Sequence, residues 1–201
     1  MSEGRIFILS APSGGGKTSL AKALIDRHPK LAFSISHTTR PARPGERDGV
    51  DYHFVDPTEF ASMVAAGAFL EHAQVFGSNY GTAHEAVRRL LTQGKDVILD
   101  IDWQGARSVK AQRPDATSVF ILPPTRAVLE SRLRERRQDS GETIEQRMHA
   151  AVAEMSHYNE FDYVIVNDDF SAALNDLEAI LGGDVHRVRP FRLDMQTLLH
   201  D

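Results

Sequence analysis

The feature that most constrains the fold of this chain is a run of glycines between an apolar segment and a helix-forming segment. Residues 7–20 read FILSAPSGGGKTSL, so the glycines are followed at once by Lys17 and Thr18. Glycines let several backbone N–H groups point into one anion-binding concavity, and a helix that begins there aims its positive end at the same anion. The sequence therefore predicts a strand, a phosphate-binding loop and a helix, in that order.

The loop matches the nucleotide-binding pattern G-x-x-x-x-G-K-[ST], except that Ala11 stands at the first glycine. The alternative is a glycine-rich turn without a ligand, which Ala11 slightly favours but the flanking strand and helix patterns oppose. We therefore expect a nucleoside triphosphate site, with Lys17 reaching the outer phosphates and the Thr18 hydroxyl ligating Mg²⁺. The residues predicted to bind ATP in this loop are Ala11, Pro12, Ser13, Gly14, Gly15, Gly16, Lys17, Thr18 and Ser19.

Apolar runs alternate with helical patterns along most of the remaining chain. The expected strands are residues 5–10, 32–36, 96–102, 117–122 and 163–167. The expected helices are residues 17–27, 104–112, 125–137, 142–160 and 170–181. Strands that are apolar throughout are typical of parallel sheets with both faces covered by helices. The pattern predicts an α/β fold with a parallel sheet.

Residues 37–95 break this alternation and are predicted to form a small insertion. The segment begins with a loop rich in proline, arginine and glycine, and short strands are expected at 51–55 and 69–75. Asp56, followed by a proline and then by a glutamate three residues on, predicts the start of a helix. A second helix is expected over 82–91.

The insertion also carries a candidate for a second anion site. Arg40 and Arg43 lie in a loop stiffened by prolines, and two guanidinium groups form a fork suited to a phosphate dianion. Tyr52 and Tyr80 are candidate neutral donors to the same anion. The alternative is a solvated basic loop. The phosphate-binding loop elsewhere in the chain favours the anion site, because a protein with one phosphate donor needs an acceptor.

Composition sets broad limits on function. The 201 residues suffice for one domain with insertions, and a net charge of −5 argues against a general nucleic-acid binder. The absence of cysteine removes disulfides and thiolate metal sites, and it fits a reducing compartment. The nine histidines form no zinc-binding motif, and no apolar window approaches the length of a membrane span. We expect a cytoplasmic protein that associates with neither membranes nor nucleic acids.

Six motifs in a fixed order resemble those of the guanylate kinase family in its bacterial form. They are SHTTRPARPGE at 36–46, DYHF at 51–54, FLEHA at 69–73, YGT at 80–82, LDIDWQG at 99–105 and IVNDD at 165–169. The resemblance extends from about residue 5 to about residue 181. It implies a P-loop kinase core (1–36, 96–124 and 150–201), a GMP-binding insertion (37–95) and a short helical lid (125–149). It also implies the reaction ATP + GMP to ADP + GDP with Mg²⁺.

The resemblance assigns the acceptor site residue by residue. Glu71 matches the family's guanine reader, since one carboxylate can accept from both N1–H and the 2-amino group; its alternative is a surface carboxylate on a short strand. Ser36 and Thr82 would donate hydroxyls to the base. Asp100 would support Glu71 or the metal. Asp102 has two alternatives, the same role or capping of the next helix. The GMP-phosphate ligands by resemblance are Arg40, Arg43, Tyr52 and Tyr80.

Charged residues near the expected lid are candidates for stabilising the transferred phosphoryl group. Arg132, Arg136 and Arg147 stand at the family's catalytic positions, and the alternative is a charged helix hairpin in which nearby carboxylates balance the arginines. Arg137 stands where the family often has glycine, with no role assigned. Asn167 matches a residue that the family places near adenine, and a simple turn residue after a strand is an equal alternative.

No general base is expected, because a phosphate monoester is already mostly ionised at neutral pH. Two rival readings are a kinase for AMP or a pyrimidine monophosphate, which Glu71 disfavours, and a peptide-binding scaffold without activity, which the intact Lys17 and Arg40 disfavour. Oligomeric state is left open. Residues 182–201 are expected either to cover the core or to join a neighbouring molecule.

Overall fold

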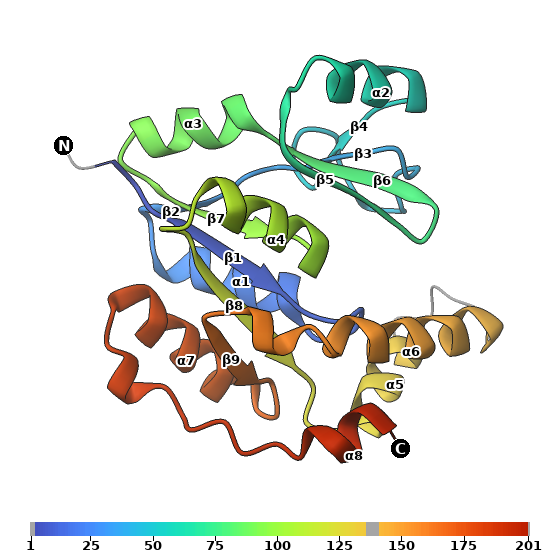
Figure 1. Ribbon diagram of the computed structural model, residues 1–201, viewed down its shortest axis with the longest axis vertical. Coiled ribbons are helices and arrows are strands. Elements are labelled where there is room, and N and C mark those ends of the chain that lie inside the picture. The colour runs from blue at the N-terminus through green and yellow to red at the C-terminus, as the bar shows by residue number, and fades with distance from the viewer. Residues whose placement is uncertain (1–2, 136–140, 201) are drawn as a thin grey trace. The chain divides into compact units, whose positions relative to one another are not determined.

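The structure is a computed structural model that describes residues 3–135 and 141–200, and Figure 1 shows its elements. The chain divides into two compact units, each built from separate stretches of sequence. The first comprises Met1–Phe7 and Pro29–Ala116, and the second comprises Ile8–His28 and Thr117–Asp201. Within the described part of the chain, none of the helices combines the length and apolar character that crossing a membrane needs. The division into core, insertion and lid at the boundaries expected from the sequence stays a prediction.

The first unit contains a small mixed sheet with strand order β4-β3-β6-β5. Its strands are β3 (His37–Thr38), β4 (His53–Phe54), β5 (Phe69–Val75) and β6 (Ser78–Ala83). β3 pairs with β4 in parallel and with β6 antiparallel, and β5 and β6 form an antiparallel hairpin. Helix α2 (Pro57–Ala65) packs on this sheet, because Phe60 stacks on Phe69 with ring centroids 4.7 Å apart.

The rest of the first unit surrounds strands β2 (Leu31–Phe33) and β7 (Asp96–Asp100), which pair in parallel with Leu31 opposite Asp96. Helices α3 (His84–Thr92) and α4 (Trp103–Gln112) flank β7 in the chain. Three residues of β7, Val97, Ile98 and Leu99, are essentially fully buried.

The second unit begins with most of β1 (Ile6–Ser10), whose five residues are all buried, followed by α1 (Lys17–Arg27). Strands β8 (Thr117–Leu122) and β9 (Tyr163–Val166) pair in parallel. Its later helices are α5 (Arg126–Glu135), α6 (Gly141–Met155), α7 (Phe170–Gly182) and α8 (Met195–His200), with 3₁₀ turns η1 (Tyr158–Glu160) and η2 (Val185–Arg187). The parallel pairing of β8 with β9, like that of β2 with β7 in the first unit, confirms the predicted α/β class with a parallel sheet.

Two helices have other bounds in the structure than the sequence predicts. The helix expected over 82–91 begins only at His84, because Thr82 and Ala83 belong to β6 and pair with Glu71 and Phe69. The helix expected over 142–160 ends at Met155 and is followed by the separate turn η1. Strands β3 and β6 and helix α8 were not expected.

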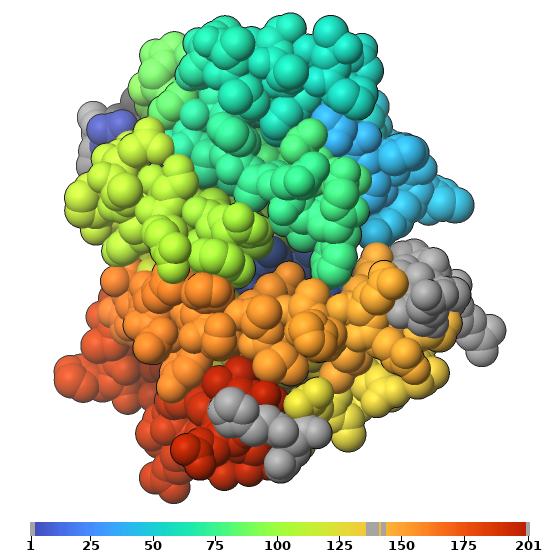
Figure 2. All heavy atoms as spheres, turned by 45° about the vertical axis from the view of Figure 1, so that its right-hand side comes forward, coloured from blue at the N-terminus to red at the C-terminus, as the bar shows by residue number. Residues whose placement is uncertain are grey.

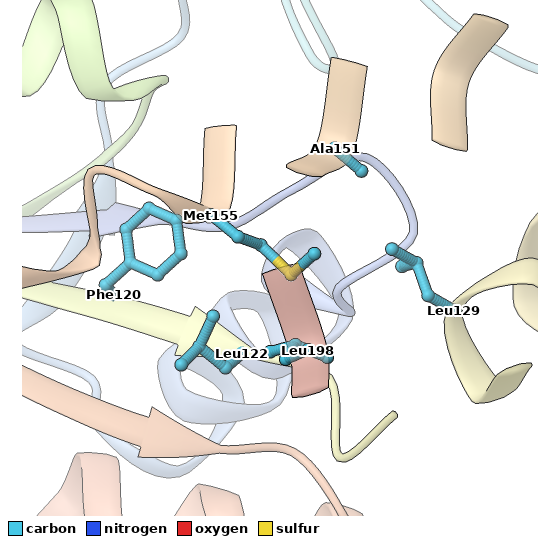
Figure 3. Close-up of a cluster of buried hydrophobic side chains, with 6 residues drawn as sticks. All are labelled: Phe120, Leu122, Leu129, Ala151, Met155 and Leu198. Atoms are coloured by element: carbon cyan, nitrogen blue, oxygen red, sulfur yellow. The ribbon is translucent and has the colours of Figure 1, made fainter. Parts of the chain in front are cut away.

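A buried cluster joins five elements of the second unit. Figure 3 shows its six buried side chains gathered around Met155. They are Phe120 and Leu122 of β8, Leu129 of α5, Ala151 and Met155 of α6, and Leu198 of α8. In Figure 2, α6 (orange) lies on the surface with α8 (red) directly below it. The last helix therefore covers the core, one of the two alternatives open for residues 182–201.

Candidate active site

The glycine loop forms an anion-binding turn at the start of α1. Gly14 and Gly16 have φ angles of 89° and 93°, and the Gly15 N–H donates to the Pro12 carbonyl oxygen at 2.8 Å. Gly16 precedes the helix and supplies no side-chain cap, and the first turn of α1 contains no acidic residue. Lys17, Thr18 and Ser19 make up that first turn, and Ala11 is buried before the loop. Backbone N–H groups at such a helix start favour a negatively charged ligand.

Three later elements of the same unit hold this loop. A Cβ placed on Gly14 would lie 3.0 Å from Leu129 Cδ1 and 3.1 Å from Leu133 Cδ2, so α5 packs directly against the loop. The Ser13 N–H donates to Glu154 Oε2 of α6 at 3.1 Å. Asn167, just past β9, donates from Nδ2 to the Gly15 carbonyl oxygen at 2.9 Å. Contacts from α5, α6 and Asn167 thus hold the loop in place, and the sequence motifs did not predict these contacts.

Arg132 and Asn167 lie together beside the loop. Arg132 Nη2 donates to the Asn167 carbonyl oxygen at 2.9 Å, and the Asn167 side chain is 3% exposed. Among the described residues, Arg132 Nη1 and Asn167 Oδ1 are buried atoms without a hydrogen-bond partner. Buried polar atoms are nearly always satisfied, so a ligand or water is expected to complete them. Arg147 lies partly buried on α6, whereas Arg136 and Arg137 fall outside the described residues.

Glu71 is not the surface carboxylate that one reading of the sequence allowed. It is 4% exposed, and Thr82, which is fully buried, donates from Oγ1 to Glu71 Oε1 at 2.5 Å. Ser36 Oγ lies 3.4 Å from Thr82 Oγ1, which brings the three predicted base-contacting side chains into one row. A buried carboxylate held by a neutral hydroxyl can accept further hydrogen bonds from a ligand.

A β-bulge and helix α4 set the direction of Glu71. The register of β5 against β6 shifts between Phe69 and Glu71, so three consecutive residues of β5 are buried. Bulges of this kind redirect side chains next to functional sites. Gln112 at the end of α4 donates to the Leu70 carbonyl oxygen at 2.7 Å, inside the bulge. At the start of α4, a Cβ on Gly105 would lie 2.6 Å from Glu71 Oε2.

The loop with the predicted phosphate ligands is organised by Glu46, a residue that the sequence analysis did not single out. Arg40 donates to both Glu46 carboxylate oxygens, at 3.0 and 2.9 Å, and the Arg43 backbone N–H donates to Glu46 at 2.7 Å. Although burial opposes its charged form, hydrogen bonding to Glu46 and Tyr80 raises the pKa of Arg40 above its usual value. The sequence signal was present, because Glu46 ends the proline-stiffened motif of that loop.

Two tyrosines lie beside that arginine. The Arg40 guanidinium lies 5.5 Å from the Tyr52 ring centroid, and the Tyr52 and Tyr80 rings are 6.0 Å apart. Burial, together with the charge of Asp100, raises the pKa of Tyr52 to about 12. The Tyr52 hydroxyl is therefore protonated at neutral pH and available as a donor to an anion.

The aspartates after β7 differ in their surroundings. Asp102 caps α4, because its Oδ1 accepts the Gly105 N–H at 2.9 Å, which agrees with the capping alternative. Asp100 ends β7 and is half-buried, and its charge acts on Tyr52. Among the described residues, no group of three or more histidine, aspartate or glutamate side chains is arranged to hold a metal ion.

Comparisons with known proteins agree on one family. The family model described as guanylate kinase matches residues 3–183. The chain is 57% identical to a guanylate kinase of Alkalilimnicola ehrlichii over 92% of this chain and 91% of that protein. It is 61% identical to a guanylate kinase of Nitrosococcus oceani over 89% and 88%.

A solved structure shares the fold. The crystal structure of guanylate kinase from Anaplasma phagocytophilum matches with a TM-score of 0.75 and 36% identity, covering 92% of this chain and 87% of that one. Since the family model covers most of the chain and the relatives match nearly end to end, this chain belongs to the guanylate kinase family.

Proposed function

We propose that this protein transfers the γ-phosphoryl group of ATP to GMP, giving ADP and GDP. Family membership supports the reaction, and the candidate residues for binding each nucleotide lie within the described part of the chain. The single observation that carries the choice of acceptor is the buried Glu71 carboxylate, which accepts a hydrogen bond from Thr82 in line with Ser36.

ATP is proposed to bind at the glycine loop. The backbone N–H groups of the loop and of the first turn of α1 would surround its phosphates, and Lys17 would neutralise the outer ones. Asn167 supports the loop through Gly15, so its contribution to ATP binding does not require contact with adenine.

Guanine is proposed to be read by Glu71. Guanine presents two donors, N1–H and the 2-amino group, side by side, and a carboxylate can accept both. Because Glu71 is almost fully buried, a base without these donors would bring no hydrogen bond to the carboxylate in a poorly solvated place. Thr82 and Ser36 would fix the carboxylate or donate to the base themselves.

The phosphate of GMP is proposed to bind Arg40, Arg43, Tyr52 and Tyr80. Arg40 is already oriented by Glu46 and the two tyrosines, so binding should cost little further side-chain entropy at this residue. Glu46 also keeps a negative charge beside this site. An incoming phosphate must therefore share or displace part of the Arg40–Glu46 pair.

Mg²⁺ is the proposed metal ion. The Thr18 hydroxyl and the Asp100 carboxylate are oxygen donors of the type that Mg²⁺ prefers, with water and phosphate oxygens as the other ligands. When bound, the ion neutralises charge on the β- and γ-phosphates.

Arg132 and Arg147, with Arg136, are proposed to stabilise the transferring phosphoryl group. Support for this role is strongest at Arg132, because one of its buried nitrogens, beside the phosphate-binding loop, has no hydrogen-bond partner among the described residues. No residue needs to act as a general base, since the acceptor oxygen is already ionised. Catalysis then rests on positioning, charge stabilisation and exclusion of water. A cytoplasmic location, where ATP and GMP are available, is proposed with the activity.

The test is a coupled assay for ADP formation with ATP, Mg²⁺ and GMP, AMP, UMP or CMP in parallel. We expect turnover with GMP alone, and a loss of kcat/KM for GMP of about a hundredfold or more in Glu71→Gln. Turnover with AMP or a pyrimidine nucleotide would overturn the role of Glu71. No turnover with any acceptor, in protein shown to be folded, would favour a scaffold that binds other proteins.

A further inference from the structure

We propose that Gly105 is a positioning residue for base selection, because the absence of a side chain there makes the room that the Glu71 carboxylate occupies. This inference rests on the proposed guanine-reading role of Glu71. Gly105 is not proposed to touch a nucleotide and acts only through the carboxylate.

The geometry places the two residues in direct competition for space. A Cβ on Gly105 would lie 2.6 Å from Glu71 Oε2 and 3.1 Å from its Cδ. The next contact, Ile101 Cβ at 3.3 Å, is only slightly tight. An alanine at 105 must therefore displace the carboxylate before anything else.

The carboxylate has little freedom to move away cheaply. Glu71 is 4% exposed, and its other oxygen accepts the hydrogen bond from the fully buried Thr82. Moving Oε2 away from α4 turns the carboxylate plane that must face the two guanine donors. A shift of a few tenths of an ångström is thus expected to reach the base contacts, since hydrogen bonds depend steeply on geometry.

Two hydrogen bonds oppose a shift of helix α4 away from the carboxylate. Asp102 accepts the Gly105 N–H at 2.9 Å, which fixes the first turn of α4. Gln112 ties the other end of α4 to the Leu70 carbonyl oxygen, next to Glu71 in β5. Helix α4 is thus attached to the β5 bulge at one end and capped at the other.

Backbone conformation gives no reason for a glycine at 105. The residue lies within α4 and does not have a positive φ angle. In such a position alanine normally stabilises a helix relative to glycine. The neighbouring Glu71 carboxylate therefore explains why this position holds a glycine, although glycine lowers helix stability.

The experiment compares wild type with Gly105→Ala, Glu71→Ala and the double variant in the coupled assay. Gly182→Ala is the matched control, because Gly182 is also helical and a Cβ there meets nothing within 4 Å. We expect Gly105→Ala to lower kcat/KM for GMP at least about tenfold while the KM for ATP stays within about twofold. Gly182→Ala should change neither.

A second readout uses IMP, which lacks the 2-amino group of GMP. The ratio of kcat/KM for GMP to that for IMP should fall in Gly105→Ala, because the displaced carboxylate loses one of its two donors. A smaller fraction of correctly folded enzyme would lower kcat/KM for GMP and for IMP by the same factor, so their ratio would stay unchanged.

The double variant separates a direct coupling from a structural effect. Without the Glu71 carboxylate, Gly105→Ala should change kcat/KM for GMP by less than about twofold and should raise the thermal midpoint. Unchanged kinetics in Gly105→Ala, or equal losses in both backgrounds, would overturn the inference. Failure of both alanine-105 variants to fold would also overturn it, whereas folding of the double variant alone would support it. If Glu71→Ala itself leaves GMP kinetics unchanged, the guanine-reading role of Glu71 is wrong and this inference falls with it, whereas a wild-type protein without GMP turnover would overturn the proposed reaction.

Discussion

At the scale of single residues, Asn167 shows how the nucleotide loop is held. Its side-chain amide donates to the Gly15 carbonyl oxygen at 2.9 Å, and a Cβ on Gly16 would collide with the same amide nitrogen. The amide therefore fits into the loop between two glycines. Neither reading open from the sequence, an adenine contact or a turn residue, included this support of the loop.

Asn167→Asp is expected to raise the KM for ATP about tenfold or more. The substitution keeps the shape but turns a donor into an acceptor that faces the Gly15 carbonyl oxygen, in a buried place. An unsatisfied buried group of this kind should also cost about 1–3 kcal/mol of unfolding free energy. Steady-state kinetics and urea unfolding measure the two effects. Asn175→Asp, on the exposed face of α7, is the matched control, and equal behaviour of both variants would contradict the role of Asn167.

Tyr52 is expected to make the stability of the protein more sensitive to alkaline pH. Its pKa is about 12 in the folded chain against an ordinary value of 10.0, because of burial and then of Asp100. Between these values the folded state keeps a proton that the unfolded state has lost, so this contribution to stability falls as pH rises from 10 toward 12. The decrease should reach about 2 kcal/mol, since each pKa unit is worth about 1.4 kcal/mol and the ring is partly exposed.

The measurement is the free energy of unfolding in urea at pH 9 and pH 11.5 for wild type and Tyr52→Phe. The variant should lose less stability between the two pH values than wild type does. Parallel losses would mean that the Tyr52 hydroxyl ionises at its ordinary pKa. At neutral pH the same variant should bind GMP more weakly, because the missing hydroxyl is a proposed phosphate donor.

At the scale of elements, helix α2 begins where local sequence chemistry predicts. The Asp56 side chain accepts the N–H groups of Thr58 and Glu59 at 2.8 and 2.9 Å, and Pro57 occupies the first helical position. Asp56→Ala is expected to lower the unfolding free energy by about 1 kcal/mol. Ser62→Ala, at an exposed site of the same helix, should stay within about 0.5 kcal/mol. Equal midpoints for the two variants in chemical denaturation would contradict the capping role.

Elements with local signals were predictable, and those that depend on pairing across the chain were not. The bounds of α1, β5 and β8 agree with the predicted ranges. The glycine loop marks the start of α1, a mainly apolar run marks β8, and apolar residues stand at both ends of β5. β6 reads SNYGTA, which is mainly polar, and the predicted helix began within it at Thr82. Its strand conformation depends on pairing with β5, which no local pattern predicts.

The site divides in the same way. The glycine loop and the candidate side chains of the acceptor site follow from motifs, and the row of Ser36, Thr82 and Glu71 agrees with them. The bulge before Glu71 depends on how β5 pairs with β6, and the contact with Gly105 depends on how α4 lies along β5. No local pattern encodes either of them.

Helix α8 is short but belongs to the core of its unit. Leu198 is 3% exposed and packs in the same cluster as Leu129, which in turn lies against Gly14 of the nucleotide loop. Leu198→Ala is expected to cost about 2–4 kcal/mol of unfolding free energy, because it removes buried methyl groups and leaves a cavity. Gln196→Ala, exposed on the same helix, is the control. A loss below about 0.5 kcal/mol for Leu198→Ala would mean that α8 does not pack on the cluster in solution.

At the scale of the whole molecule, the two compact units correspond to the two proposed substrates. All candidate residues for GMP belong to the unit formed by Met1–Phe7 and Pro29–Ala116. The glycine loop, Asn167, Arg132 and Arg147 belong to the unit formed by Ile8–His28 and Thr117–Asp201. Each unit has its own buried core and could respond to its own ligand, because a ligand stabilises the structure that binds it.

Hydrogen exchange is therefore expected to show a separate footprint for each nucleotide. A non-hydrolysable ATP analogue alone should slow exchange in the glycine loop and in α5, which packs on it through Leu129 and Leu133. GMP alone should slow exchange in β5, β6 and the first turn of α4, where Glu71, Thr82 and Gly105 lie. AMP at the same concentration is the control for GMP and should leave β5 unchanged. If GMP alone protected the glycine loop as strongly as the ATP analogue does, the assignment of one substrate to each unit would be wrong, because that footprint requires a GMP site at the loop.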